Sequence, residues 1–258
     1  MKQFFGRLSN PVKPPTSREE PNQTSLQLEQ AQRQNRKLEQ QLEQARRRNK
    51  KIRQKLDDTK QQLKQAKKAK LQLEGVIRDS ILRRMLKGSV CAEIGVHEGS
   101  FSREILDVVQ PARLHLIDPW KHEEDDRYHQ SWYGGLGSEG QAIMDQRYLA
   151  VREQFDQEIR AGQVQVHRSY SDAASEEFAD SYFDWIYIDG NHLYEFVKKD
   201  LKLYYPKVKT DGYITGDDYG AQNWWENGVQ KAVDEFVSQR PELTLEVSGR
   251  QFVIKKSV

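Results

Sequence analysis

The chain has 258 residues, of which 36% are hydrophobic, and its mean hydropathy is −0.91. This length allows one α/β domain with an appendage, and the low hydropathy indicates that a long stretch of the chain never enters a core. The net charge of +2 hides an asymmetry, because residues 24–75 contain 15 Lys and Arg against 6 Asp and Glu, whereas residues 76–258 carry a net charge of −9, which predicts a basic arm on an acidic body.

Residues 1–23 place four prolines among polar residues and predict a disordered leader. The apolar stretch at the N-terminus is too short for a secretory signal, and no run reaches the length of a membrane-spanning helix. The single cysteine, Cys91, excludes an intrachain disulfide and a cysteine-only metal site. We expect a cytoplasmic protein, and peripheral contact with a membrane through the N-terminal phenylalanines stays open.

Residues 24–75 contain no proline and no glycine before Gly75, and their side chains are those of good helix formers. With Leu28 at heptad position a, a seam runs through seven heptads without a slip. The a positions are Leu28, Asn35, Leu42, Asn49, Leu56, Leu63 and Lys70, and the d positions are Ala31, Leu38, Ala45, Ile52, Thr59, Ala66 and Leu73. This repeat predicts a coiled coil and therefore a homo-oligomer through residues 24–75.

The seam favours a parallel dimer, because Asn35 and Asn49 at a positions pair with their twins across a two-stranded coil. The flanking charges oppose this, since Arg48 would face Arg53 in a parallel dimer. A marginal coil is therefore expected. Two roles of the basic segment stay open: a solvated oligomerisation stalk, and a surface for anionic lipid, polysaccharide or nucleic acid.

Residues 76–258 begin with a short amphipathic helix and then alternate strand and helix patterns. Strand-like apolar runs occur at Val90–Ile94, Leu114–Ile117, Val164–His167, Trp185–Ile188, Tyr213–Thr215, Leu243–Val247 and Phe252–Ile254. The first five alternate with helices, which predicts a parallel sheet covered on both faces. The last two are close together and predict a hairpin. We expect an α/β fold with a seven-stranded, mostly parallel sheet and a C-terminal antiparallel hairpin.

A glycine-containing turn follows the first of these strands. It has the pattern Glu93-x-Gly95-x-x-x-Gly99, after which a helix begins. Glycines in a strand-to-helix turn allow close approach of the backbone to a ligand, although a structural tight turn has the same pattern. The spacing differs from the Gly-x-Gly-x-x-Gly of dinucleotide-binding proteins. Asp118 ends the second strand. At that place an aspartate can accept hydrogen bonds from ribose hydroxyls, or it can cap a turn.

Carboxylates also end the fourth and fifth strands. Asp189 ends the fourth, His192 follows three residues later, and Asp217 and Asp218 close the fifth. Adjacent parallel strands bring these carboxylates to one rim, where they repel one another unless a cation or protons compensate. Oxygen ligands suit Mg²⁺, and a histidine beside the cation fits a general base. The alternatives are solvated carboxylates and a His192 that only caps the loop.

Five segments together carry a resemblance to a known family. They are Glu93-x-Gly95-x-x-x-Gly99, Leu116-Ile117-Asp118-Pro119-Trp120, Tyr187-Ile188-Asp189-Gly190-Asn191-His192-x-Tyr194, Asp200-Leu201 and Gly216-Asp217-Asp218-Tyr219. Over residues 88–256 the chain resembles a class I S-adenosylmethionine-dependent methyltransferase, and most closely the sugar O-methyltransferase group typified by macrocin and mycinamicin O-methyltransferases. Class I enzymes in general share only the first two segments, and the coiled coil lies outside the resemblance.

The resemblance implies a Rossmann-like sheet, S-adenosylmethionine as cofactor and a Mg²⁺ site. The cofactor residues that it implies are Glu93, Gly95, Gly99, Ser100, Asp118 and Ser171. The implied Mg²⁺ ligands are Asp189, Asp217 and Asp218, and the implied catalytic residues are His192, as general base, and Asp189. Asp217 departs from the group, which often has Glu or His at that place.

The implied reaction is methyl transfer to a sugar hydroxyl. The activated sulfonium methyl needs mainly an aligned acceptor oxygen, Mg²⁺ on vicinal hydroxyls lowers the pKa of the attacking hydroxyl, and His192 takes its proton. Residues 121–150 predict a loop that covers the substrate, because they are rich in aromatic side chains. Trp224 and Trp225 are candidates for the opposite wall or, alternatively, for core or oligomer contacts.

Four alternative functions compare with this one as follows. The glycine spacing disfavours a nicotinamide-dependent enzyme. Methyltransferases of base amino groups typically carry Asn/Asp-Pro-Pro-Tyr/Phe where this chain has Asp189-Gly-Asn-His. A non-catalytic coiled-coil scaffold with a cofactor-binding domain stays open, as does a non-sugar acceptor. A glycan, a glycosylated natural product and a lipid-linked saccharide all fit as sugar acceptors.

Overall fold

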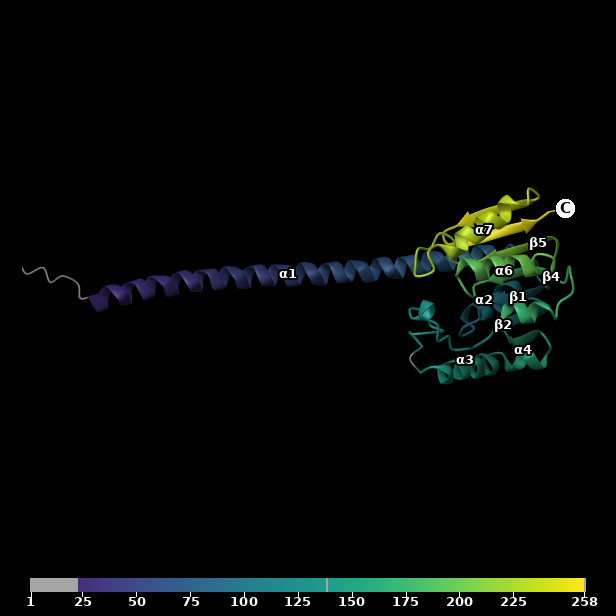
Figure 1. Ribbon diagram of the computed structural model, residues 1–258, viewed down its shortest axis with the longest axis horizontal. Helices are drawn as coiled ribbons and strands as arrows, with labels where there is room; N and C mark the ends of the chain where they lie inside the picture. The colour runs from purple at the N-terminus through teal and green to yellow at the C-terminus, as the bar shows by residue number, and fades with distance from the viewer. Residues whose placement is uncertain (1–22, 138, 258) are drawn as a thin grey trace, which may run out of the picture. The chain divides into compact units, whose positions relative to one another are not determined.

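The structure is a computed structural model that describes residues 23–137 and 139–257 (Figure 1). The chain divides into two compact units, the first ending at Lys67 and the second beginning at Lys68. The leader expected over residues 1–23 lies outside the described residues, except for Gln23. Among the helices of the described ranges, none is long and apolar enough to cross a membrane.

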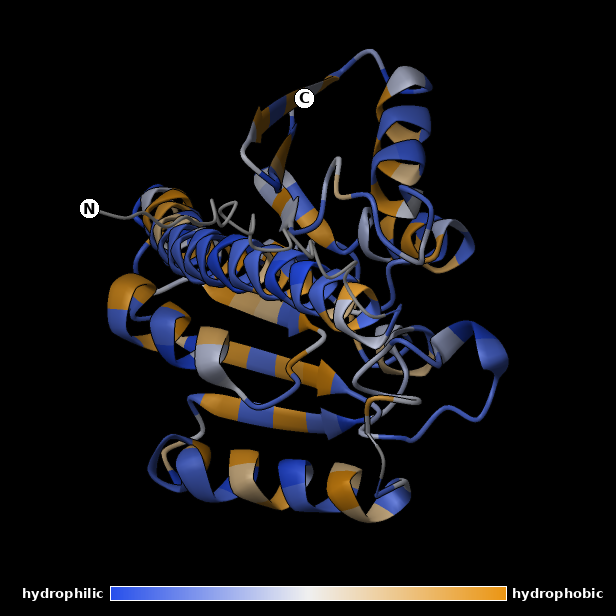
Figure 2. Ribbon diagram, turned by 90° about the vertical axis from the view of Figure 1, so that its left-hand side faces the viewer, coloured by the Kyte–Doolittle hydropathy of each residue, from blue (hydrophilic) through white to orange (hydrophobic). Residues whose placement is uncertain are grey.

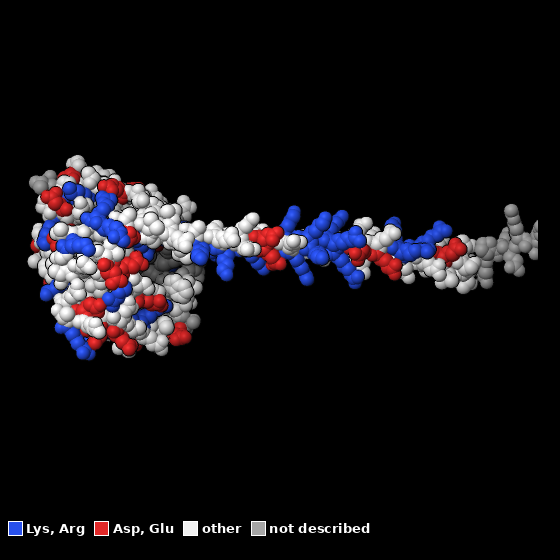
Figure 3. All heavy atoms as spheres, turned by 180° about the vertical axis from the view of Figure 1, so that it is seen from behind, with Lys and Arg blue, Asp and Glu red and all other residues white. Residues whose placement is uncertain are grey.

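Helix α1 (Gln23–Leu82) contains the whole basic segment. Side chains between residues 23 and 67 are exposed, and two residues of the predicted seam, Leu28 and Ile52, are 60% and 62% exposed. Lys and Arg side chains project along much of this helix (Figure 3). The separate helix expected after Gly75 is instead the end of α1. One glycine costs a helix about 1 kcal/mol, and burial of Ile81 and Leu82 beyond it offsets that cost.

The second unit is built on one seven-stranded sheet. Its strands are β1 (Val90–Ile94), β2 (Arg113–Asp118), β3 (Val164–Arg168), β4 (Phe183–Ile188), β5 (Val208–Gly216), β6 (Leu243–Ser248) and β7 (Gln251–Lys256). The strand order is β3-β2-β1-β4-β5-β7-β6. Strands β1 to β5 are parallel, whereas β7 pairs antiparallel with both β5 and β6. The predicted fold class is therefore confirmed.

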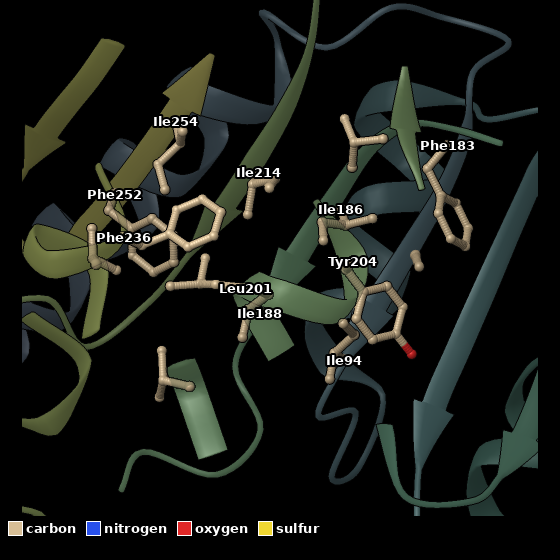
Figure 4. Close-up of a cluster of buried hydrophobic side chains, with 14 of the residues drawn as sticks. Ile94, Phe183, Ile186, Ile188, Leu201, Tyr204, Ile214, Phe236, Phe252 and Ile254 are labelled. Atoms are coloured by element: carbon tan, nitrogen blue, oxygen red, sulfur yellow. The ribbon is translucent and has the colours of Figure 1, made fainter. Parts of the chain in front are cut away.

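Helices cover both faces of this sheet and bury two separate cores. They are α2 (Ser100–Val109), α3 (Gln141–Gln154), α4 (Asp156–Arg160), α5 (Ser171–Ser175), α6 (Tyr194–Tyr204) and α7 (Gly228–Ser238). On one face, α6 and α7 pack Leu201, Tyr204 and Phe236 against Ile186 and Ile214 of the sheet (Figure 4). On the other face, the end of α1 together with α2 and α3 covers the strands. Apolar and polar residues alternate along these elements (Figure 2), as one-sided burial requires.

Two segments differ from the sequence-based expectation. Strand β5 begins five residues earlier than Tyr213, because Val208 pairs with Phe183 before the register shifts at a bulge. Asp211, with φ of 63°, lies in that bulge, and its polar neighbours hide the strand from an apolar pattern. The predicted loop 121–150 contains a short 3-10 turn, η1 (Asp126–Tyr128), and ends where α3 begins at Gln141.

Candidate active site

A cleft of about 840 Å³ opens at the carboxyl ends of β1, β2 and β4. This is the edge at which open α/β sheets bind ligands, and the volume lies within the range of small-molecule sites. Predicted residues that line the cleft are Gly95, Asp118, Ser171, Asp189, His192 and Asp218. The remaining predicted residues, Glu93, Gly99, Ser100 and Asp217, lie behind or beside this lining.

Gly95 forms the closest backbone contact at the cleft. Its φ is +93°, and a Cβ there would lie 2.1 Å from the carbonyl oxygen of Asp189. The Gly95 N–H donates to the Ile117 carbonyl at 2.9 Å, and the Asp189 N–H donates to that of Ile94 at 2.7 Å. Only glycine therefore allows β1 and β4 to end side by side. Gly99, with φ of 77°, precedes α2 against Phe155, and Ser100 is exposed at the start of that helix.

Glu93 lies beneath the glycine turn and is 2% exposed. Its Oε2 accepts a hydrogen bond from the Ser102 hydroxyl on α2. Burial raises the pKa of Glu93 well above its usual range, and the Ser102 hydroxyl counteracts this only in part. The structure thus places Glu93 below the cleft, where its carboxyl group braces the turn against α2.

Asp118 is fully engaged by protein donors. Its Oδ2 accepts from the N–H groups of Val96 and His97, at 2.9 and 3.0 Å, and from the Tyr133 hydroxyl at 2.5 Å. Its Oδ1 accepts from the Trp120 N–H at 2.7 Å. In this structure Asp118 ties the glycine turn to the covering loop. Tyr133, which belongs to the aromatic loop predicted to cover the substrate, thus occupies one oxygen of Asp118, while Asp118 still lines the cleft.

The cleft also contains an unsatisfied polar group. Nε2 of His97 is buried without a hydrogen-bond partner among the described residues. Burial and, next, the neighbouring Arg147 cation lower the pKa of His97, which favours the neutral ring. A buried polar atom of this kind is stabilised when a ligand completes its hydrogen bond. This observation fits a polar ligand such as S-adenosylmethionine at the glycine turn.

The carboxylates predicted from strand ends do converge on His192. Nε2 of His192 lies 3.3 Å from Asp189 Oδ1 and 3.0 Å from Asp218 Oδ2. Burial is the main effect that raises the pKa of Asp189, and the His192 hydrogen bond opposes it. Ligand atoms of Asp189, His192 and Asp218 all lie within 4.8 Å of one another. Asp217 is absent from this group and is 8% exposed.

Two arginines that the sequence analysis missed compensate these carboxylates. Arg78, from the end of α1, forms an ion pair with Asp217 and lies 4.0 Å from Asp189 Oδ2. Burial acts to lower the pKa of Arg78, but the surrounding Tyr187, Asp217 and Asp189 outweigh it and raise the value. Arg250, in the turn between β6 and β7, forms an ion pair with Asp218. The acidic rim is thus paired with protein cations.

Aromatic side chains form the walls of the cleft. The rings of His192 and Trp225 stack with centroids 4.6 Å apart, and Trp224 meets Tyr128 of η1 edge to face at 5.6 Å. The Tyr128 hydroxyl accepts a hydrogen bond of 2.7 Å from the Asn191 side chain. Both tryptophans and the covering loop therefore border the space beside His192.

Ser171 begins α5 and donates a hydrogen bond of 2.5 Å to Asp200 Oδ1 on α6. Asp200 is 3% exposed. Burial raises its pKa from 3.8 to about 7, while the Ser171 hydroxyl lowers it. In the folded protein Asp200 therefore keeps a proton that the unfolded chain releases near pH 4. Because the folded state then binds more protons, the free energy of unfolding falls as the pH rises from about 4 to about 7.

Asp200→Asn is expected to raise the free energy of unfolding at pH 8 by about 2–4 kcal/mol, because asparagine resembles the protonated acid. The gain should shrink to a small remainder at pH 4, where Asp200 is protonated in the folded protein and about half protonated in the unfolded chain. Urea unfolding of both proteins at pH 4, 6 and 8 measures this. Asp107→Asn, an exposed aspartate on α2, serves as control and should show no such trend. A pH-independent difference would contradict the assignment.

The chain is similar in sequence to known proteins over part of its length. Residues 92–219 match the model of a family described as a methyltransferase domain. A 55-residue stretch is 42% identical to "Uncharacterized protein R132" of Acanthamoeba polyphaga mimivirus, and covers 21% of this chain and 24% of that protein. The match thus spans about a quarter of this curated relative.

Two solved structures share the fold. The O-methyltransferase NovP superposes with a TM-score of 0.52 at 18% identity, over 70% of this chain and 80% of NovP. A protein from Corynebacterium glutamicum superposes with a TM-score of 0.50 at 14% identity, over 72% of this chain and 81% of that one. Residues 92–219 thus match a methyltransferase-domain family, and the second unit shares with these two structures a Rossmann-like fold, here with a seven-stranded sheet.

Proposed function

We propose that the protein is an O-methyltransferase that moves the methyl group of S-adenosylmethionine to a hydroxyl of a sugar or glycosylated acceptor. The observation that carries this proposal is the position of His192. Its ring lies at the carboxyl edge of a methyltransferase domain, between two carboxylates and against an aromatic wall. Methyl transfer to a hydroxyl requires a base that removes its proton, whereas transfer to a stronger nucleophile needs no such base.

The carboxylates orient the proposed base. The Nε2–H group of His192 donates a hydrogen bond to Asp189 or Asp218, so Nδ1 carries the lone pair. Nδ1 is then the atom that takes the proton of the acceptor hydroxyl. The proton moves to Nδ1 as the oxygen attacks the methyl carbon, and the carboxylates stabilise the resulting imidazolium. Trp225 limits rotation of the ring by stacking on it.

The proposed sugar acceptor rests on the lining of the cleft. Trp224, Trp225 and Tyr128 offer aromatic faces, and polar groups from Asn191 and the acidic rim lie beside them. Aromatic faces with a few polar groups suit the apolar faces and hydroxyl edges of sugars. The covering loop excludes water when a substrate is bound, which favours transfer over side reactions.

Mg²⁺ is part of the proposal only as a weakly held ion at Asp189 and Asp218, the two rim carboxylates that belong to the cluster with His192. Asp189 and Asp218 present oxygens to the cleft, while Asp217 would join them only without its Arg78 partner. The oxygen donors fit a hard cation. Bound there, the ion would polarise the acceptor hydroxyl.

Helix α1 supports the further proposal of a homodimer. Its exposed leucines repeat with heptad spacing over residues 24–75, and a second copy of the same helix would cover them. The basic side chains around this seam suit an anionic surface or assembly partner as well. Light scattering on the full chain tests the dimer.

The function is tested by calorimetric titration of S-adenosylmethionine, with NAD as control. We expect a dissociation constant of about 1–100 μM for S-adenosylmethionine and no binding of NAD. Transfer of a labelled methyl group to a panel of saccharides and catechols then tests the acceptor class. Failure to bind S-adenosylmethionine would leave the non-catalytic scaffold as the better explanation, and transfer to catechols alone would refute the sugar acceptor.

A further inference from the structure

Arg78 contacts one aromatic ring and two carboxylates at the acidic rim. Its guanidinium lies over the ring of Phe101, 5.3 Å from the centroid, and forms an ion pair with Asp217. Asp189 Oδ2 lies 4.0 Å from the same nitrogen. The side chain is 29% exposed, so this is a built contact from the end of α1 and not a chance surface pair.

Both carboxylate oxygens of Asp217 already have a protein partner in this arrangement. Its Oδ2 pairs with Arg78, and its Oδ1 accepts a hydrogen bond of 2.6 Å from the Asp218 N–H. The residue also lies outside the lining of the cleft, unlike Asp189 and Asp218. A site made of all three carboxylates therefore conflicts with the observed position of Arg78.

Protein cations already offset part of the negative charge at the rim. Arg78 and Arg250 lie among the carboxylates of Asp189, Asp217 and Asp218, and Arg250 also lies 3.6 Å from Glu74 Oε1. A divalent ion that entered this arrangement would meet a guanidinium at close range in a partly buried setting, where like charges repel strongly. A metal ion and the guanidinium would therefore compete for Asp189 and Asp217.

We propose that Arg78 is the resident cation of this rim: its guanidinium occupies the Asp189–Asp217 pair and keeps a divalent ion from binding all three carboxylates. This inference rests on the proposed role of the rim as a cation site, but it needs neither the sugar acceptor nor methyl transfer. Nε of Arg78 is buried and has no hydrogen-bond partner among the residues that the structure describes. Arg78 thus positions Asp217 and Asp189 where a metal ion would otherwise do so.

Titration of Mn²⁺ into the full-length protein, with free Mn²⁺ followed by electron paramagnetic resonance, tests the inference without any reaction. Wild-type protein is expected to bind Mn²⁺ with a dissociation constant weaker than about 0.5 mM. Arg78→Gln removes the competing charge and should bind at least about 10-fold more tightly. Adding Asp217→Asn to Arg78→Gln should abolish that gain, because the third carboxylate is then lost.

Arg84→Gln is the matched control, since Arg84 pairs with Glu246 away from the rim. It should bind Mn²⁺ as wild type does. Tight binding by wild-type protein would overturn the proposal even if the Arg78 variant fails to fold. A folded Arg78→Gln variant, verified by its melting curve, that gains no Mn²⁺ affinity would overturn it as well. Titration of S-adenosylmethionine into the same proteins reports separately on the methyltransferase function.

Discussion

Replacing His192 by alanine is expected to slow methyl transfer by about 10²- to 10⁴-fold, the usual contribution of a positioned general base. The ring lies 3.0 Å from Asp218 and 3.3 Å from Asp189, so its loss removes the proton acceptor together with its orienting hydrogen bonds. The affinity for S-adenosylmethionine should change by less than about twofold, because the activated methyl group needs no base to bind. Single-turnover transfer and calorimetry on the same preparation measure the two quantities.

Imidazole added to the alanine variant provides the control. It should restore part of the rate if a ring nitrogen takes the proton, and should leave the wild-type rate unchanged. A variant that keeps more than about a tenth of the wild-type rate would exclude His192 as general base. Parallel loss of rate and cofactor affinity would instead indicate that the ring only supports the fold of the loop.

Gly95→Ala is expected to destabilise the protein by about 3–5 kcal/mol and to weaken S-adenosylmethionine binding severely. The alanine Cβ would lie 2.1 Å from the carbonyl oxygen of Asp189, and φ at this position is +93°. Since the clash is with backbone, β1 and β4 must separate and Asp189 must move. Urea unfolding and calorimetry with the cofactor measure the two effects.

Gly162→Ala separates the backbone strain from the clash. Gly162 also has a positive φ, 72°, but a Cβ there would meet nothing within 4 Å. It should cost only about 1–2 kcal/mol and leave cofactor binding intact. Equal effects of the two substitutions would show that close approach of the strands at Gly95 does not matter.

Most of the fold follows from local patterns in the sequence. Apolar runs of four or five residues between helix patterns predict strands such as β1 and β4, and the hairpin of β6 and β7 follows from their short separation. Strand β5 is the exception, because only Val208 and the residues from Tyr213 onward pair with β4, and the polar bulge around Asp211 between them interrupts any apolar period. Likewise α1 passes Gly75, since burial of its last turns depends on the sheet and not on helix propensity.

Part of the candidate site could likewise be predicted from the sequence and part could not. Asp189, His192 and Asp218 could be placed together from the sequence, because neighbouring parallel strands deliver their carboxyl ends to one edge. The partners of the other predicted carboxylates could not be predicted, since Arg78 reaches Asp217 across 139 residues of sequence and Tyr133 contacts Asp118 from a loop. The sequence by itself thus determined the sheet and the acidic residues at its rim. Only the tertiary structure decided what neutralises and covers them, because ion pairing between distant segments depends on packing that has no local signal.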